Sequence, residues 1–343
     1  MIKKYTFIAA AVAFVTMFGC KEDKPTLNFY TWSDYIEMDN VKNFEKEFNC
    51  NVKIDTFDSN EFMYSKIKSG ATGYDIILPT SYMAEIMNKD GLLEQLDKSK
   101  LPNIANINSE FLENVSKDAK MEYSVPFLIG FTCIAYNKTK VPAPEESWAI
   151  FANPEYKNRM TMLDDVPETM GAALKYLGYS MNTTDDAQIN EAKELLLKWK
   201  LNLAKFDNEV YKTGLASGEF YIVQGYSGDL FQVMEDSDDL DFFVPKEGSS
   251  ISSDDFVILK SSKNKDLAYA FINYMNSKEA AALNMEYTYF SSPVLGAGEL
   301  VSDELKDHPG IKLDPQMYKT CEAILELGED RNKYIKAWDE IKK

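Results

Sequence analysis

Aromatic rings and carboxylates stand side by side in several short segments of this sequence, most clearly in Trp32-Ser33-Asp34-Tyr35. A ring face and a negative charge at one spot suit an ammonium ion that carries methylene groups. A core tryptophan beside an acidic helix cap would produce the same residues. This segment alone therefore leaves binding and packing equally open.

Three more segments offer hydroxyls, rings and carboxylates. Two follow predicted strands, 79–82 with Thr80 and Tyr82 and 226–229 with Tyr226; the third, 252–255 with Ser252 and Asp254, stands just before a predicted strand. Thr80 also fits an ordinary helix cap, and a mixed run of Ser and Asp is usually a solvated loop. Binding is therefore one of two interpretations for each of these segments.

Asp165 and Glu168 stand three residues apart in Asp164-Asp165-Val166-Pro167-Glu168 and could grip one amine together. The same spacing is typical of a capping box at a helix start, with Pro167 in the first turn, which stabilises a helix by about 1 kcal/mol. Spacing alone favours the cap. A third hypothesis is an enzyme that uses the two carboxylates as acid and base.

Length and charge narrow the class of protein. The 343 residues suffice for two ordinary domains, and the formal net charge is −18. Nucleic acid is disfavoured as a partner, because phosphate contacts need clustered Lys and Arg. An acidic body raises the concentration of a cationic ligand near its surface, although solubility alone would also explain the charge.

The first residues are typical of an exported protein. Lys3 and Lys4 precede an apolar run that ends at Phe18 and is shorter than the about 20 residues of a membrane-spanning helix. The Gly19-Cys20 pair that follows resembles the bacterial lipoprotein signal. We predict a signal peptide over 1–19, a lipid on Cys20, a tether over 20–25, and an extracytoplasmic, lipid-anchored location.

Cysteine and histidine leave little room for metal or nucleophilic chemistry. Cys50, Cys133 and Cys321 cannot all pair and lack metal-ligand spacing, so we predict mostly buried thiols with one disulfide possible. His308 is the single histidine and sits in a turn-like segment. We predict no metal, no cofactor and no catalytic residue.

Strand-like and helix-like runs alternate along the chain. We expect strands near 26–31, 51–57, 74–79, 131–136, 160–163, 221–223, 241–244 and 255–259, and helices near 38–48, 60–68, 82–89, 168–177, 186–203, 265–276 and 330–342. This rhythm favours an α/β fold with a largely parallel sheet. Such sheets bind ligands beyond the carboxyl ends of their strands. We predict that 131–136 and 255–259 cross between two α/β lobes.

Several longer stretches resemble one family over nearly the whole mature chain. They are 27–35 (Leu-Asn-Phe-Tyr-Thr-Trp-Ser-Asp-Tyr), 58–64, 92–101, 177–180 with 182–185, and 245–248. On these stretches the sequence is similar to the spermidine/putrescine-binding proteins of ABC transporters. The resemblance implies a two-lobed type II periplasmic-binding-protein fold, each lobe a mostly parallel sheet flanked by helices. It implies lobe 1 over 26–132 and 256–314, and lobe 2 over 133–255 and 315–343.

The resemblance also assigns roles by matched position. Aromatic walls would be Trp32, Tyr82 and Tyr226; amine partners would be Asp34, Asp165, Glu168 and Asp254; further contacts would be Ser33, Tyr35, Thr80 and Ser252. Ser252 stands where a spermidine-binding relative has tryptophan, and Ser33 and Asp34 are shorter than their counterparts. These departures leave the choice between putrescine and spermidine open.

The resulting hypothesis is a monomer that captures putrescine or spermidine and delivers it to ABC permease subunits. It would touch the membrane only through its N-terminal lipid. A sensor module that presents a polyamine to a membrane receptor is the alternative within binding proteins, and the sequence does not separate the two.

Overall fold

The computed structural model describes residues 24–108, 112, 115–116 and 118–343. The predicted signal peptide, the lipidation site Cys20 and residues 20–23 of the predicted tether lie outside these residues. Within the described ranges, none of the helices combines the length and the apolar character that a membrane span requires.

The strands form one continuous sheet in the order β2-β1-β3-β9-β4-β7-β5-β6, with β8 paired to β4 off this path. Their bounds are β1 (Thr26–Trp32), β2 (Asn51–Phe57), β3 (Ile76–Ile77), β4 (Val125–Asn137), β5 (Met160–Met162), β6 (Leu203–Phe206), β7 (Ile222–Tyr226), β8 (Leu240–Phe243) and β9 (Ile251–Ile258). Strand β1 pairs in parallel with β2 and β3, and β5 pairs in parallel with β6 and β7. Each end of the sheet therefore has the expected parallel pairs.

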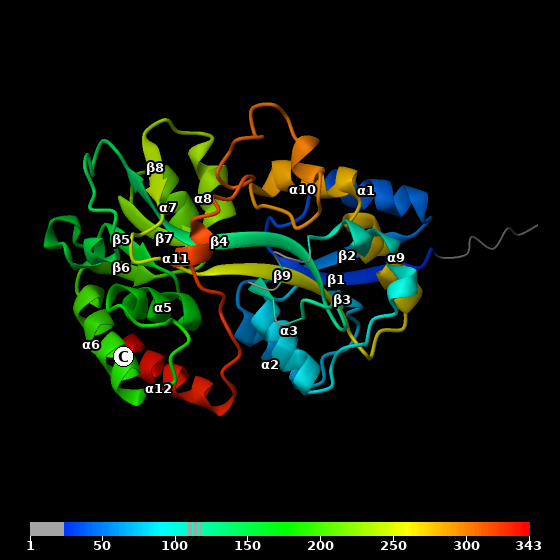
Figure 1. The fold of residues 1–343 in the computed structure, drawn as a ribbon, viewed down its shortest axis with the longest axis horizontal. Coiled ribbons are helices and arrows are strands. Elements are labelled where there is room, and N and C mark those ends of the chain that lie inside the picture. The colour runs from blue at the N-terminus through cyan, green and yellow to red at the C-terminus, as the bar shows by residue number, and fades with distance from the viewer. Residues whose placement is uncertain (1–23, 109–111, 113–114, 117) are drawn as a thin grey trace, which may run out of the picture.

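Strands β4 and β9 run antiparallel to each other and connect the two lobes of the molecule (Figure 1). They also add antiparallel pairs to each lobe, β3 with β9 and β4 with β7 and β8. Strand β9 begins at Ile251, earlier than predicted. Ser252 and Asp254 consequently lie on a strand, and the solvated-loop interpretation of this segment is wrong.

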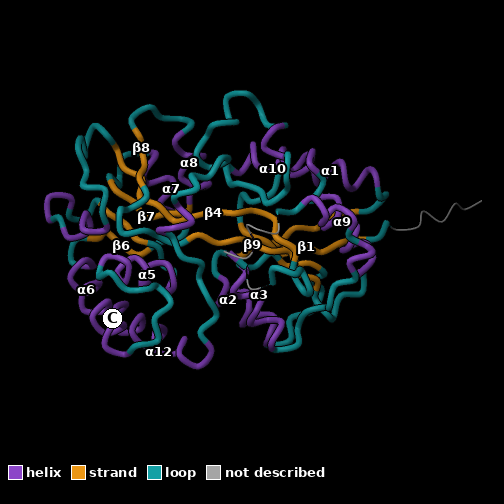
Figure 2. The backbone as a smooth tube through the Cα atoms, viewed as in Figure 1, coloured by secondary structure: helices purple, strands orange, loops and turns teal. Residues whose placement is uncertain are grey.

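Helices surround the sheet on the outside of both lobes (Figure 2). Their bounds are α1 (Met38–Glu47), α2 (Asn60–Lys68), α3 (Ser81–Lys89), α5 (Val166–Tyr176), α6 (Asp186–Lys200), α7 (Val210–Ala216), α8 (Ser227–Met234), α9 (Lys265–Met275), α10 (Lys278–Thr288), α11 (Met317–Thr320) and α12 (Arg331–Lys342). Helices α7, α8, α10 and α11 and strand β6 were not predicted from the sequence.

The amphipathic spacing of helix α6 explains its position. Ile189, Ala192, Leu196 and Trp199 are buried along one face at helical intervals. The side chain of Asp185 begins the helix by accepting hydrogen bonds from two backbone N–H groups of the first turn. Helix α6 therefore buries one stripe against the lobe and leaves the other in solvent.

The C-terminal helix α12 belongs to the same hydrophobic core as α5 and α6. Its buried residues Tyr334, Ala337, Trp338 and Ile341 join a cluster that includes Trp199. This packing ties residues 331–342 to the second lobe, as the predicted grouping of 315–343 requires. The lobe boundaries themselves stay a prediction.

The three cysteines of the described chain are free and buried, which confirms the predicted buried thiols. They form no disulfide with one another. His308 packs between the rings of Phe231 and Tyr289 and accepts a hydrogen bond from the Gly310 N–H at Nδ1. Burial lowers the pKa of His308. The side chains of the described residues form no metal-binding cluster.

Candidate ligand-binding site

A cavity of about 840 Å³, partly open to solvent, lies where segments of both lobes meet. Six carboxylates and several rings contribute to its walls. The lining residues are Trp32, Ser33, Tyr35, Phe57, Asp58, Asn60, Thr80, Tyr82, Gly130, Phe131, Thr132, Asp165, Glu168, Asn208, Glu209, Lys212, Tyr226, Asp229, Ser252, Asp254, Phe290 and Ile324. All the predicted contact residues except Asp34 are among them.

The sheet explains why residues so far apart in the chain meet here. Trp32 ends β1, Tyr226 ends β7, and Asp165 lies between β5 and the start of α5. Thr80 precedes α3 directly after β3. Carboxyl ends of strands in the same sheet come together at one edge, where α/β folds bind their ligands.

Asp254 is held by hydroxyl groups. Its Oδ1 accepts a hydrogen bond from Thr80 Oγ1 at 2.7 Å, and its Oδ2 accepts one from the Tyr35 hydroxyl. Thr80 in turn accepts from Asn60 Nδ2 at 3.1 Å. Thr80 occupies the N-cap position of α3, as the helix-cap interpretation predicted, but its side chain makes no capping hydrogen bond and instead donates to Asp254. Burial raises the pKa of Asp254 to about 6.

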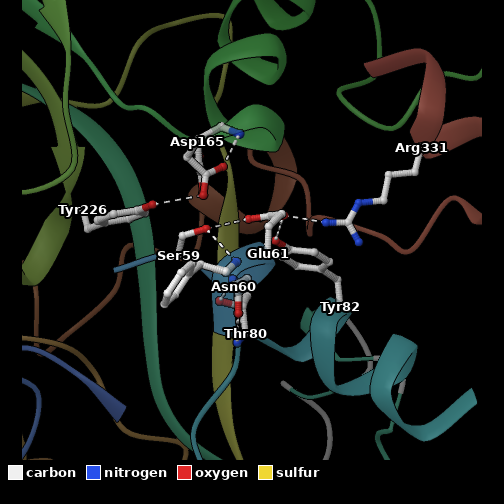
Figure 3. Close-up of polar contacts among 10 residues, drawn as sticks. Ser59, Asn60, Glu61, Thr80, Tyr82, Asp165, Tyr226 and Arg331 are labelled. Carbon is white, nitrogen blue, oxygen red and sulfur yellow. Dashed lines mark hydrogen bonds and ion pairs between the residues drawn. The ribbon is translucent and has the colours of Figure 1, made fainter. Parts of the chain in front are cut away.

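Asp165 serves as a helix cap and as a cavity wall at once. Its Oδ1 accepts a hydrogen bond from the Glu168 N–H at 3.0 Å, which confirms the predicted cap of α5. Its Oδ2 accepts from the Tyr226 hydroxyl at 3.3 Å (Figure 3). Burial raises the pKa of Asp165 well above its ordinary value, and the nearby carboxylates of Glu61 and Glu168 raise it further.

The Glu168 side chain does not accept a hydrogen bond from the backbone N–H of Asp165, as a full capping box would require. Its Oε2 accepts hydrogen bonds from Thr132 Oγ1 at 2.8 Å and from Ser250 Oγ at 2.6 Å. These hydroxyls lie on β4 and just before β9, so Glu168 links helix α5 to the two crossing strands. Burial raises its pKa.

Aromatic rings cover much of the remaining wall. Trp32 packs against Phe57 with ring centroids 4.4 Å apart, and Tyr35 packs against Phe290 at 5.1 Å. Burial raises the pKa of Tyr226 well above its ordinary value, so its hydroxyl stays a neutral donor. Ring faces beside carboxylates offer a cation both Coulomb attraction and cation–π contact.

The charge of the cavity favours a cationic ligand. Within the described chain, Asp165, Glu168 and Asp254 form no ion pair with a basic side chain, and Lys212 is the one cation among the lining residues. Several buried carboxylates held close together without counter-charges raise one another's pKa values. A ligand with two ammonium groups separated by methylenes would supply the missing charge and fill the apolar space.

Comparison with known proteins identifies the family. Residues 40–312 match the model of the bacterial extracellular solute-binding proteins. This chain belongs to that family. A putrescine/cadaverine-binding protein of Pseudomonas aeruginosa is 32% identical over 356 aligned residues, which cover 100% of this chain and 99% of the relative.

Solved structures agree with this assignment. The spermidine/putrescine ABC transporter substrate-binding protein PotD of Streptococcus pneumoniae is 36% identical, with a TM-score of 0.80 over 93% of this chain and 98% of that one. The lipoprotein Tp0655 of Treponema pallidum is 33% identical, with a TM-score of 0.84 over 92% of this chain and 99% of that one. The predicted two-lobed type II fold is confirmed.

Asp34 is the predicted contact residue that this solute-binding protein keeps away from its cavity. It follows β1 in the left-handed region with a φ of +52°, and its side chain is 62% exposed. Its Oδ2 lies 3.7 Å from Nζ of Lys212. Because the backbone turns at this residue, the position of Asp34 does not support the predicted contact with an amine.

Other lining residues of the solute-binding protein were missed by sequence reasoning. Asp58 directly follows β2, and Asp229 lies in the segment 226–229, so both had a signal in their place after a strand. Asp229 accepts a hydrogen bond from the Tyr211 hydroxyl at 2.7 Å. Ile324 comes from the C-terminal segment, where no motif pointed to the cavity.

Proposed function

We propose that this solute-binding protein captures a polyamine, putrescine or spermidine, in the cavity between its lobes and delivers it to an ABC permease. The observation that carries this proposal is the set of cavity carboxylates that lack basic partners among the described residues and stand beside aromatic rings. The names of its relatives as binders of putrescine, cadaverine and spermidine support the same ligand class.

The binding contacts we propose are made by Trp32, Ser33, Tyr35, Thr80, Tyr82, Asp165, Glu168, Tyr226, Ser252 and Asp254. Charge-assisted hydrogen bonds contribute about 1.5–3 kcal/mol each, and each buried methylene about 0.8 kcal/mol. Association costs at least about 4 kcal/mol. Micromolar affinity, about −8.2 kcal/mol, therefore needs several contacts at each ammonium group and a cleft that closes on the ligand.

Calorimetry on protein lacking residues 1–20, freed of carried-over ligand by unfolding and refolding, tests the proposal. Putrescine, spermidine and cadaverine should each be titrated, with 1-butylamine as the control that has a carbon chain of the same length as putrescine but only one charge. We expect saturable binding of a diamine or triamine and at least tenfold weaker binding of butylamine. Absence of heat with all three polyamines would refute the proposal.

We further propose that the protein is anchored outside the cytoplasm by a lipid on Cys20 and acts as a monomer. The basic, apolar and Gly19-Cys20 order at the N-terminus supports the anchor, as does the description of the Treponema relative as a lipoprotein. Mass spectrometry of the membrane-purified protein should find acyl chains on Cys20, and Cys20→Ser should release it from membranes. Light scattering of the unlipidated protein should give the mass of one chain.

A further inference from the structure

An ion pair between the lobes stands at one end of the candidate site. Glu61 lies on α2, and Arg331 is the first residue of α12. Arg331 Nη2 lies 2.5 Å from Glu61 Oε1, and the same oxygen accepts a hydrogen bond from the Tyr82 hydroxyl at 3.2 Å. Ser59 Oγ donates to the other oxygen of Glu61 at 3.2 Å. Both oxygens of the Glu61 carboxylate thus already accept hydrogen bonds from donors of the protein itself.

The guanidinium of Arg331 also faces a ring. Its Cζ lies 5.6 Å from the centroid of the Tyr82 ring, and Tyr82 lines the cavity described above. Figure 3 shows Glu61 between Asp165 on one side and Arg331 on the other. A carboxylate plus a ring around a cation is the arrangement that an ammonium group of the ligand would find elsewhere in the site.

A second cavity of about 510 Å³ is lined in part by both residues of this ion pair. It shares Tyr82 and Ile324 with the first cavity, so the two have a common wall. Its lining is mostly apolar and comes from both lobes: Glu61, Tyr82, Val166, Pro167, Met181, Asn182, Ile324, Leu325, Glu326, Leu327, Arg331, Tyr334 and Ile335. Glu61 and Arg331 line this second cavity and not the first, so a linear ligand that extends past Tyr82 would meet their ion pair there.

We propose that Arg331 sets the length of ligand that the protein accepts, by occupying the carboxylate-and-ring position that the outer ammonium group of a longer polyamine would take. This proposal rests on the proposed function. The side chains of Arg331 and Glu61 are 22% and 37% exposed, so the pair is partly withdrawn from solvent. With Arg331 in place the site ends at Tyr82, and it selects a diamine such as putrescine over the triamine spermidine.

The decisive variant is Arg331→Met, which removes the charge, keeps an unbranched side chain and leaves the Glu61 carboxylate without its cation. We expect the wild-type protein to bind putrescine more tightly than spermidine. In Arg331→Met the ratio of the spermidine to the putrescine association constant should rise at least fivefold. Arg331→Lys, which keeps a cation at this place, should change the ratio less than twofold.

A matched control separates length selection from simple closure of the lobes. Lys89 on α3 and Glu326 also form an ion pair, at 2.6 Å, and Lys89 lines neither cavity. Lys89→Gln should change both affinities by a similar factor and leave their ratio within twofold. A ratio shift in Lys89→Gln equal to that in Arg331→Met would overturn the proposal, since Arg331 would then act only by holding the two lobes together.

The double variant Arg331→Met with Glu61→Gln checks the role of the freed carboxylate. It should lose the spermidine gain of the single variant, because no negative charge remains for the outer ammonium group. An unchanged ratio in Arg331→Met, or a wild-type preference for spermidine, would also overturn the length proposal. Failure of the wild-type protein to bind any polyamine would instead refute the proposed function, so the two failures are distinguishable.

Discussion

Two carboxylates near the cavity, Asp254 and Glu61, differ in what surrounds them. Asp254 accepts hydrogen bonds from the neutral hydroxyls of Thr80 and Tyr35. Glu61 also accepts from a hydroxyl but is neutralised by the guanidinium of Arg331. Neutral donors orient a carboxylate and leave its charge for a ligand, whereas a cation of the protein consumes that charge. A carboxylate's partners therefore decide how much of its charge remains available to a cationic ligand.

The same division extends to the rest of the cavity. Glu168 is held by hydroxyls and Asp165 by a backbone N–H and a tyrosine, like Asp254. Asp229 instead lies 3.8 Å from Nζ of Lys212. We expect substitutions of Asp165, Glu168 and Asp254, which accept hydrogen bonds from hydroxyl groups, to weaken ligand binding most. Substitutions around Lys212 should change the affinity least.

The largest effect is expected from Asp254→Asn. It removes one unpaired cavity charge and keeps the size of the side chain, so the affinity for putrescine should fall ten- to a hundredfold, the loss of about one charge-assisted contact. Calorimetry measures the change. Asp34→Asn is the matched control, because Asp34 is exposed and lies off the cavity; it should alter affinity less than threefold. Equal effects of the two variants would mean that Asp254 acts only in the fold.

The pH should modulate binding through the same carboxylate. The pKa of Asp254 is raised to about 6, so in the ligand-free protein its contribution to stability is present below about pH 4 and is lost as the pH rises through about 6. A dication binds the ionised form. The affinity for putrescine should therefore fall about tenfold from pH 7.5 to pH 5, where one part in about ten of a group with this pKa is ionised.

Titration calorimetry at several pH values, in buffers of different ionisation heat, measures this dependence and the protons released on binding. Asp165 and Glu168, whose pKa values are also raised, would add to the fall in affinity. Asp254→Asn should show a shallower slope. An affinity independent of pH across this range would contradict the presence of a carboxylate with a raised pKa in contact with the ligand.

A smaller effect is expected when the ring of Tyr226, which donates a hydrogen bond to Asp165, is removed. Tyr226→Leu loses a cation–π contact of about 0.5–1.5 kcal/mol, so putrescine affinity should fall about three- to tenfold. Tyr226→Phe keeps the ring and removes only the hydrogen bond to Asp165, so it should lie between wild type and Tyr226→Leu. Tyr221→Leu is the control, since that ring packs under Arg159 and does not line the cavity.

The smallest effect is expected at Lys212, the cation that lies beside Asp229. Lys212→Met removes a positive charge 3.8 Å from Asp229, so the affinity for a dication should rise about two- to threefold. Because Lys212 is a charge at moderate distance, this gain should shrink at high salt. Lys205→Met is the control, because Lys205 also pairs with an aspartate, Asp207, but lies outside the cavity; it should leave affinity unchanged. A loss of affinity in Lys212→Met would mean that Lys212 positions Asp229 for binding.

Local sequence patterns predicted much of the scaffold. Strand β2 and helix α2 begin and end at the predicted residues, because each has a clear alternation or helical spacing. Helix α8 was missed because Ser227 and Gly228 open it without a usual cap signal. The start of β9 was missed because its Ser and Asp residues are polar, yet Ser253 and Asp255 are fully buried and hydrogen-bond to each other.

The sequence by itself determined which residues could carry the chemistry: rings and carboxylates placed after strands, an acidic total charge and a cap at Asp165. Tertiary structure decided which carboxylates stay free. Glu61 and Arg331 are 270 positions apart, and only the docking of α12 brings them together. Asp34, which looked like a binding residue, is turned outward by one left-handed backbone angle. The physical reason is that charge pairing depends on distances of a few ångströms between side chains from different elements, which local patterns do not encode.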